Sequence, residues 1–152
     1  APIRQKAHYA FIDNSLSFAK SQGKTSTVGV FQAEEVAYLL KKGQTIESPI
    51  ITVEDRLLIG KKAKRHENAG DAVSVAEWQE LPILIANVKT VLYDVRNDSV
   101  LYILKSLDEN DPKVIKLSLR VQNGVIEIVS VFKILDGAIE DGLNATHYEL
   151  IR

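Results

Sequence analysis

The stretch KVIKLSLRV at residues 113–121 decides the fold class, because from Ile115 to Val121 its side chains alternate between apolar and polar. The apolar members are Ile115, Leu117, Leu119 and Val121, and the polar members are Lys116, Ser118 and Arg120. A period of two is typical of a β-strand that buries one face. The following Gln122-Asn123-Gly124 predicts a tight turn, since glycine adopts positive φ without strain. Residues 125–133 then predict a second strand that returns along the first.

The same period extends backwards from this hairpin. Residues 89–95 and 99–107 each predict a strand, with turns at 96–98 and 108–112. Short connections favour neighbouring strands that run in opposite directions. Residues 89–135 therefore predict a four-stranded antiparallel meander.

Residues 1–88 predict a mainly helical part. Residues 33–43 carry acids at the start, lysines near the end and Gly43 as a stop signal. Thr52-Val53-Glu54-Asp55 resembles a capping box and predicts a helix that ends near His66. Ser74 to Glu77 predicts a further cap, and Pro82 starts or kinks another short helix. We therefore expect an α+β fold in which N-terminal helices, 33–42 and 53–66 among them, pack on one face of the four-stranded sheet.

The two ends of the chain carry weaker patterns. Residues 22–27 have the composition of a loop, and residues 136–152 form an acidic tail that predicts one more strand at its end. A length of 152 residues suits a single domain, so the helical part, the sheet and the tail are expected to form one unit over residues 1–152.

Composition narrows the classes of function. The net charge of −1 argues against a general nucleic-acid coat, although it leaves room for a local basic site. The chain has no cysteine, so disulfides, zinc–thiolate sites and thiol nucleophiles are excluded. No apolar run reaches the length of a membrane span and no signal peptide is evident at the start. We therefore expect a cytoplasmic location and no membrane partner.

The predicted helix that ends at His66 holds the first candidate site. At 100° per residue, Lys62 and His66 fall inside the apolar stripe, while Lys61, Lys64 and Arg65 project to its flanks. A histidine that titrates near neutral pH, beside cations that bind phosphate, suits transesterification of RNA. The alternative is a packed histidine at a helix end, with solvated lysines around it.

The predicted sheet holds the second candidate set. Lys116, Ser118 and Arg120 share one face, which either contacts phosphates or is an ordinary solvated face. Ser130 is expected on an apolar face with Ile126, Ile128 and Phe132, where its hydroxyl needs a hydrogen bond. Lys133 ends that strand. Tyr93 and Tyr102 alternate with apolar neighbours, which favours the core over a platform for stacked bases.

Several motifs in order carry a resemblance over about residues 28–135. They are Lys41-Lys42-Gly43, the Ile-Ile-Thr-Val segment at 50–53, Lys64-Arg65-His66, the segment from Trp78 to Asn87, Val91-Leu92-Tyr93-Asp94, and the strand from Ile128 to Lys133. This order resembles the phage-encoded branch of the barnase–EndoU–colicin–RelE nuclease superfamily. Such domains are often found at the C-terminal end of phage Mu-F-type minor head proteins.

The resemblance implies a toxin-like endoribonuclease that cleaves RNA without metal or cofactor, on a fold of helices packed against a four-stranded antiparallel sheet. It implies catalytic roles for His66 as acid or base, Ser130 at the hydroxyl position of the last strand, and Arg120 at the charge that builds on phosphate. The expected substrate-binding residues are Lys62, Arg65, Tyr102, Lys116 and Lys133. The partners would be RNA, with tRNA as one candidate, and an immunity or virion protein, in the host cytoplasm or in the virion. The alternative is a non-catalytic virion or host-interaction module on the same fold.

Overall fold

The computed structural model describes residues 2–152, without the side chains of Pro2, Arg4 and Lys62. Within these residues the helices are α1 (Pro2–Leu16), α2 (Ala33–Lys41), the 3-10 turn η1 (Asp55–Leu57), α3 (Lys61–Ala69), α4 (Val75–Gln79), α5 (Leu81–Ala86) and α6 (Asp136–Asn144). The strands are β1 (Thr25–Val30), β2 (Ile50–Glu54), β3 (Thr90–Asp94), β4 (Ser99–Leu104), β5 (Lys113–Gln122), β6 (Val125–Leu135) and β7 (Tyr148–Leu150). The predicted α+β class is confirmed.

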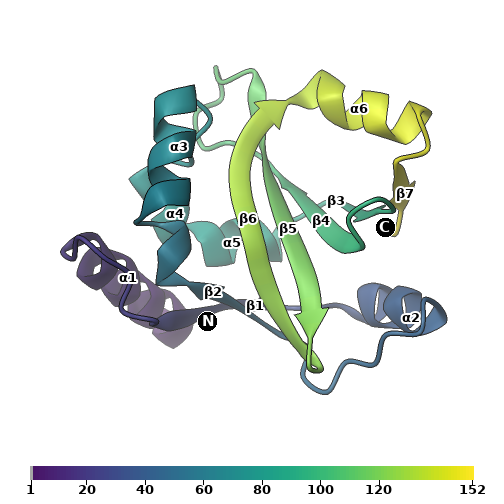
Figure 1. Cartoon of the computed structure of the whole chain (residues 1–152), viewed down its shortest axis with the longest axis horizontal. Coiled ribbons are helices and arrows are strands. Elements are labelled where there is room, and N and C mark those ends of the chain that lie inside the picture. Colours follow the sequence, from purple (N-terminus) through teal and green to yellow (C-terminus); the bar gives the residue numbers. More distant parts are fainter. Residues whose placement is uncertain (1) are drawn as a thin grey trace.

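The strands within residues 2–152 form one seven-stranded mixed sheet with the order β1-β2-β6-β5-β4-β3-β7 (Figure 1). The predicted four-stranded antiparallel meander is therefore wrong as a description of the sheet. The predicted strands β3 to β6 do follow one another with antiparallel pairing, but they form only part of it. β1 and β2 add to β6 through a short parallel contact of Ile51 and Thr52 with Ile126 and Glu127. β7 adds to β3 at the opposite end.

The two faces of the sheet bury separate apolar clusters. On β4, Tyr102 belongs to the main core, whereas its neighbour Leu101 belongs to a second cluster with Leu92 and Ile139 of α6. Neighbouring strand residues point to opposite faces, so α6 lies on the face opposite to the main core. Helices α1, α2, α4 and α5 contribute residues to the main core, namely Ile12, Leu39, Trp78, Leu81 and Ile85. The expected packing of N-terminal helices on one face is thus supported in part.

The helix predicted over residues 53–66 is wrong in its first part and is borne out only from Lys61, where α3 begins. Residues 50–54 form β2, because Ile51 and Val53 are buried and the strand pairs with β1 on one side and β6 on the other. Long-range pairing of β-branched residues outweighs the local resemblance to a capping box. Gly60, with a φ of 107°, then separates η1 from α3, which begins only at Lys61.

The expected face of Ser130 also needs correction. A β-bulge shifts the register of β6 against β5, so that Ile128 pairs with Leu119 whereas Ser130 pairs with Ser118. Ile126 and Ile128 are therefore buried in the main core, while Ser130 and Phe132 turn to the opposite face. One extra residue in a strand reverses the side of everything that follows it.

The ends of the chain contain more structure than their composition suggests. Helix α1 and strand β1 occupy residues that are hard to interpret in the sequence, and β1 overlaps the segment predicted as a loop. The expected C-terminal strand is confirmed as β7, but α6 was missed within the acidic tail. Among the described residues, no helix is both long enough and apolar enough to cross a membrane.

His8 of α1 links three elements in the interior. Its side chain is fully buried, its Nε2–H donates to the carbonyl oxygen of Trp78 over 2.6 Å, and its Nδ1 lies 2.8 Å from the hydroxyl of Ser26. Burial lowers the pKa of His8 from its ordinary value of 6.5, although the hydrogen bond to Trp78 acts in the opposite direction. The neutral imidazole is therefore the form that the folded protein favours.

We expect the folded state to lose stability as the pH falls below 6.5, because the unfolded chain then binds a proton at His8 that the folded chain resists. Urea unfolding midpoints at about pH 7.5 and about pH 5 would measure this loss. The His8→Gln protein should show a smaller difference between the two pH values. An equal difference in both proteins would assign the pH dependence to other groups.

Candidate functional site

Two neighbouring strands place three polar side chains and one aromatic side chain together, on the face of the sheet that also carries α6. This group consists of Lys116 and Ser118 of β5 with Ser130 and Phe132 of β6, and we call it the lysine–serine patch. Ser118 lies opposite Ser130 and Lys116 lies opposite Phe132 across the two strands. The bulge in β6 is what places Ser130 and Phe132 here, and bulges often re-aim side chains next to functional sites.

Helix α3 places His66 at the edge of this patch. The imidazole stacks on the ring of Phe132, with centroids 4.9 Å apart and planes 9° from parallel. Its Nδ1 lies 3.0 Å from a carboxylate oxygen of Asp71. The segment after α3 is itself fixed to β6, because the backbone N–H of Lys133 donates to the carbonyl oxygen of Asp71 over 2.8 Å. In Figure 1, α3 and α6 lie on either side of the upper part of β6.

The second ring nitrogen of His66, Nε2, is a buried polar atom without a hydrogen-bond partner among the residues that the structure describes. If Asp71 accepts a hydrogen bond from Nδ1–H, Nε2 carries a lone pair and can act as a base. Neighbouring side chains cover this atom in the structure.

Lys116 supplies a cation at the centre of the patch. Its Nζ lies 4.8 Å from the centroid of the Phe132 ring, so His66 and Lys116 both contact the same aromatic side chain. Within residues 2–152, excluding the undescribed side chains, Lys116 makes no salt bridge. Burial lowers the pKa of Lys116, and the charge of Asp94 offsets part of this effect. A cation without a carboxylate partner is available to an anion.

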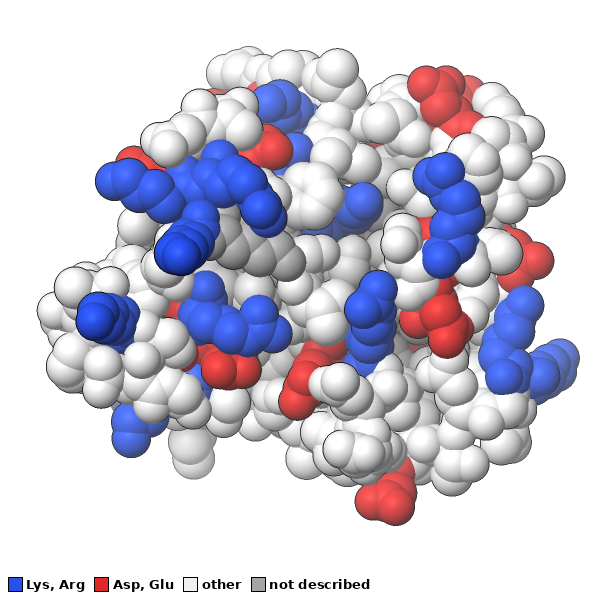
Figure 2. Space-filling model, in the orientation of Figure 1, with Lys and Arg blue, Asp and Glu red and all other residues white. Residues whose placement is uncertain are grey.

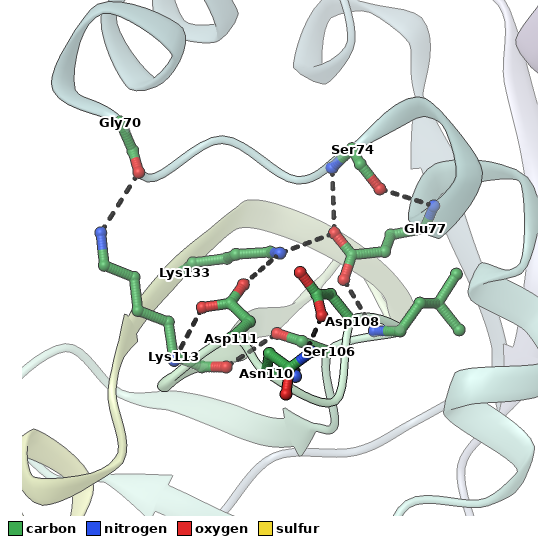
Figure 3. A network of polar contacts seen from close by, with 10 residues as sticks. Gly70, Ser74, Glu77, Ser106, Asp108, Asn110, Asp111, Lys113 and Lys133 are labelled. Carbon is green, nitrogen blue, oxygen red and sulfur yellow. Dashed lines mark hydrogen bonds and ion pairs between the residues drawn. The ribbon is translucent and has the colours of Figure 1, made fainter.

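Lys133 lies on the other face of β6, where its charge is already compensated. Its Nζ lies 2.9 Å from Glu77 and 2.7 Å from Asp111. Figure 3 shows the ammonium group between these two carboxylates, with Ser74 bonded to Glu77. Burial would raise the pKa of Glu77, but hydrogen bonds from Ser74, Lys133 and Leu107 outweigh it and hold the pKa below its usual range. Lys133 therefore stabilises the fold and lies apart from the lysine–serine patch.

The other expected site residues are dispersed. Tyr102 is buried in the main core, where its hydroxyl donates to Glu35. Arg120 is exposed on β5 and lies about 13 Å along the strand from Lys116, at the usual rise per residue. Arg65 is exposed on α3. The side chain of Lys62 lies outside the described part of the structure. The structure thus brings His66, Lys116 and Ser130 to one region and separates Lys133 and Tyr102 from it.

Basic side chains gather over α3 beside the site. Lys61, Lys64 and Arg65 are exposed there, and together with Lys20 they line a shallow depression. Figure 2 shows this basic patch as the blue group at the upper left, over the position of α3. Such a patch attracts a phosphate backbone without reading its sequence.

Sequence reasoning missed the partners that orient the candidate residues. Asp71 received no functional role there, and Phe132 was expected only as an apolar strand residue. Asp71 follows His66 at a spacing that allows contact around a helix end, which is a signal that the sequence carries. The stacking of Phe132 depends on the bulge and carries no such signal.

No family model, no curated protein and no solved structure matches this chain. Among the described residues, no group of three or more histidine, aspartate or glutamate side chains is arranged to hold a metal ion.

Proposed function

We propose that this chain is an endoribonuclease that cleaves RNA by attack of the 2′-hydroxyl on the adjacent phosphate. The observation that carries the proposal is the pairing of His66 and Lys116 on one aromatic ring, with the histidine oriented by Asp71. An imidazole oriented by a carboxylate and an ammonium group, both in contact with the ring of Phe132, would supply a base and an acid to one reaction. The exposed cations of α3 add a surface for the RNA backbone.

In this mechanism Nε2 of His66 accepts the proton of the 2′-hydroxyl as its oxygen bonds to phosphorus. Lys116 stabilises the charge on the phosphoryl oxygens. It also donates a proton to the 5′ oxygen as the bond from phosphorus to that oxygen breaks, because a lowered pKa makes its ammonium group a stronger acid. The product is a 2′,3′-cyclic phosphate and a free 5′-hydroxyl. Ser130 contributes a hydroxyl that orients the phosphate, and Arg120 contacts the RNA further along β5.

We expect the wild-type protein to cleave RNA in the presence of EDTA and to leave 2′,3′-cyclic phosphate or 3′-phosphate ends. Incubation with total RNA, followed by end-group analysis, measures this. An oligonucleotide with hydrogen in place of the 2′-hydroxyl at the cleaved position should remain intact, because the nucleophile is missing. Cleavage of that oligonucleotide, or 5′-phosphate products, would contradict the mechanism.

A second candidate function is a non-catalytic binding module. The burial of Nε2 of His66 favours it. The Nε2 atom is covered in this structure, and an imidazole that stacks on Phe132 and binds Asp71 also suits a purely structural role. Such a module would bind RNA or a virion protein without cleaving. Failure of well-folded protein to cleave any RNA would favour this function over the first.

A further inference from the structure

A crevice of about 600 Å³ opens on the side of the main core, away from the lysine–serine patch. Its apolar walls are Val28 and Val30 of β1 and Pro82, Ile83, Ile85 and Ala86 of α5. Its polar lining includes Gln32, Glu34, Tyr102 and Arg152. Volume and lining match those of small-molecule sites, which combine apolar walls with a few convergent polar groups.

Tyr102 and Arg152, which line the crevice, both form hydrogen bonds with the buried carboxylate of Glu35. Glu35 is fully buried, and its carboxylate accepts hydrogen bonds from the hydroxyl of Tyr102 over 2.6 Å, the backbone N–H of Gln32 over 2.9 Å and Nη2 of Arg152 over 3.3 Å. The hydrogen bond to Glu35 raises the pKa of Arg152, which stays charged. The guanidinium group of Arg152 thus forms an ion pair with the buried carboxylate of Glu35.

Glu34, which also lines the crevice, has a side chain that is largely exposed to solvent. Glu34 lies 3.6 Å from Nε of Arg152, and 56% of its side chain is exposed. Its carboxylate accepts no hydrogen bond from a described residue. Among the described side chains of this group, the carboxylates of Glu34 and Glu35 outnumber the single guanidinium group of Arg152, so their summed charge is negative. A ligand that carries a positive charge at the mouth and an apolar body inside fits this arrangement.

We propose that this crevice binds an organic cation with an apolar body, such as an arylalkylamine, whose ammonium group pairs with Glu34 while its body lies between β1 and α5. The proposal is independent of RNA cleavage, because the residues that line the crevice include no member of the lysine–serine patch and neither His66 nor its partners Asp71 and Phe132.

The test is an NMR titration of the ¹⁵N-labelled full chain with 2-phenylethylamine up to about 10 mM, which covers weak affinities for a ligand of this size. The backbone amides of Val28, Val30 and Ala86 should shift in a saturable way. The matched ligand 3-phenylpropionate has the same ring and the opposite charge, and it should bind at least fivefold more weakly. Absence of saturable shifts at these amides, or equal affinity for the two ligands, would overturn the proposal.

Two variants locate the binding site. Glu34→Gln should weaken the amine by about two- to fivefold, the range for a partly exposed ion pair. Ala86→Leu, at an exposed position of the wall, should abolish the shifts by filling the crevice, while the circular dichroism spectrum stays that of the wild type. Glu109→Gln, an exposed acid in the loop between β4 and β5, is the matched control and should bind normally. Wild-type affinity in the Ala86→Leu protein would place the amine elsewhere and refute the assignment.

Discussion

We expect the His66→Ala protein to cleave RNA about 10²- to 10⁴-fold more slowly than the wild type, which is the usual contribution of a positioned acid or base. The reason is the hydrogen bond from His66 to Asp71, which holds one imidazole nitrogen and leaves Nε2 for the proton of the 2′-hydroxyl. Single-turnover cleavage of a labelled oligonucleotide would measure the loss. Circular dichroism and urea unfolding would show whether the variant remains folded, because the lost ring also stacks on Phe132.

Two further variants separate catalysis from other effects of the substitution. His147→Ala removes a histidine that is outside the patch and should leave the rate unchanged. Asp71→Asn keeps the size of the side chain but weakens its hold on the imidazole, so it should lower the rate less than His66→Ala and shift the pH profile of cleavage. If the double variant His66→Ala/Ser130→Ala cleaves at the wild-type rate, neither residue has the proposed role.

The Lys133→Met protein should lose about 3–5 kcal/mol of its free energy of unfolding, the usual cost of removing one partner from a buried ion pair. Only 2% of the Glu77 side chain and 11% of the Lys133 side chain are exposed, so the substitution leaves a buried carboxylate without its cation. Asp111 also loses a partner, although more of it is exposed. Urea unfolding at neutral pH measures the effect.

The exposed lysine Lys105 provides the control for this prediction, because Lys105→Met changes the same charge without a buried partner. That protein should unfold within about 0.5 kcal/mol of the wild type. Combining Lys133→Met with Glu77→Gln should recover part of the lost stability, since the amide needs no cation. A loss below about 1 kcal/mol in Lys133→Met would mean that the pair behaves like an ordinary surface salt bridge.

The sequence predicts best where local pattern and final environment agree. The alternation in residues 113–121 places Ile115, Leu117 and Leu119 in the core and Lys116 and Ser118 on the other face, as the structure confirms. The capping box at Ser74 and Glu77 is likewise confirmed. These features depend on residues close together in the chain, so their signals need no knowledge of distant partners.

Prediction from the sequence fails where contacts between residues far apart in the chain determine the local structure. Ile51 and Val53 form a strand because β1 and β6 provide partners, and a local cap signal carries no information about them. The pairing of Lys133 with Glu77 and Asp111 joins β6 to α4 and to the loop between β4 and β5, and no local motif indicates it. The bulge in β6 reverses the side of Ser130 through one additional residue, which a strict period of two cannot represent.

The parallel contact between β2 and β6 has a consequence for synthesis of the chain. Strands β3 to β6 follow one another, so each can pair soon after its neighbour has been made. β2 is made much earlier than β6, yet it depends on β6 for its second partner. The edge of β2 therefore waits unpaired while most of the chain emerges from the ribosome. During that interval the antiparallel pair of β1 and β2 is the part of the sheet most exposed to pairing with another chain, or to protection by a chaperone.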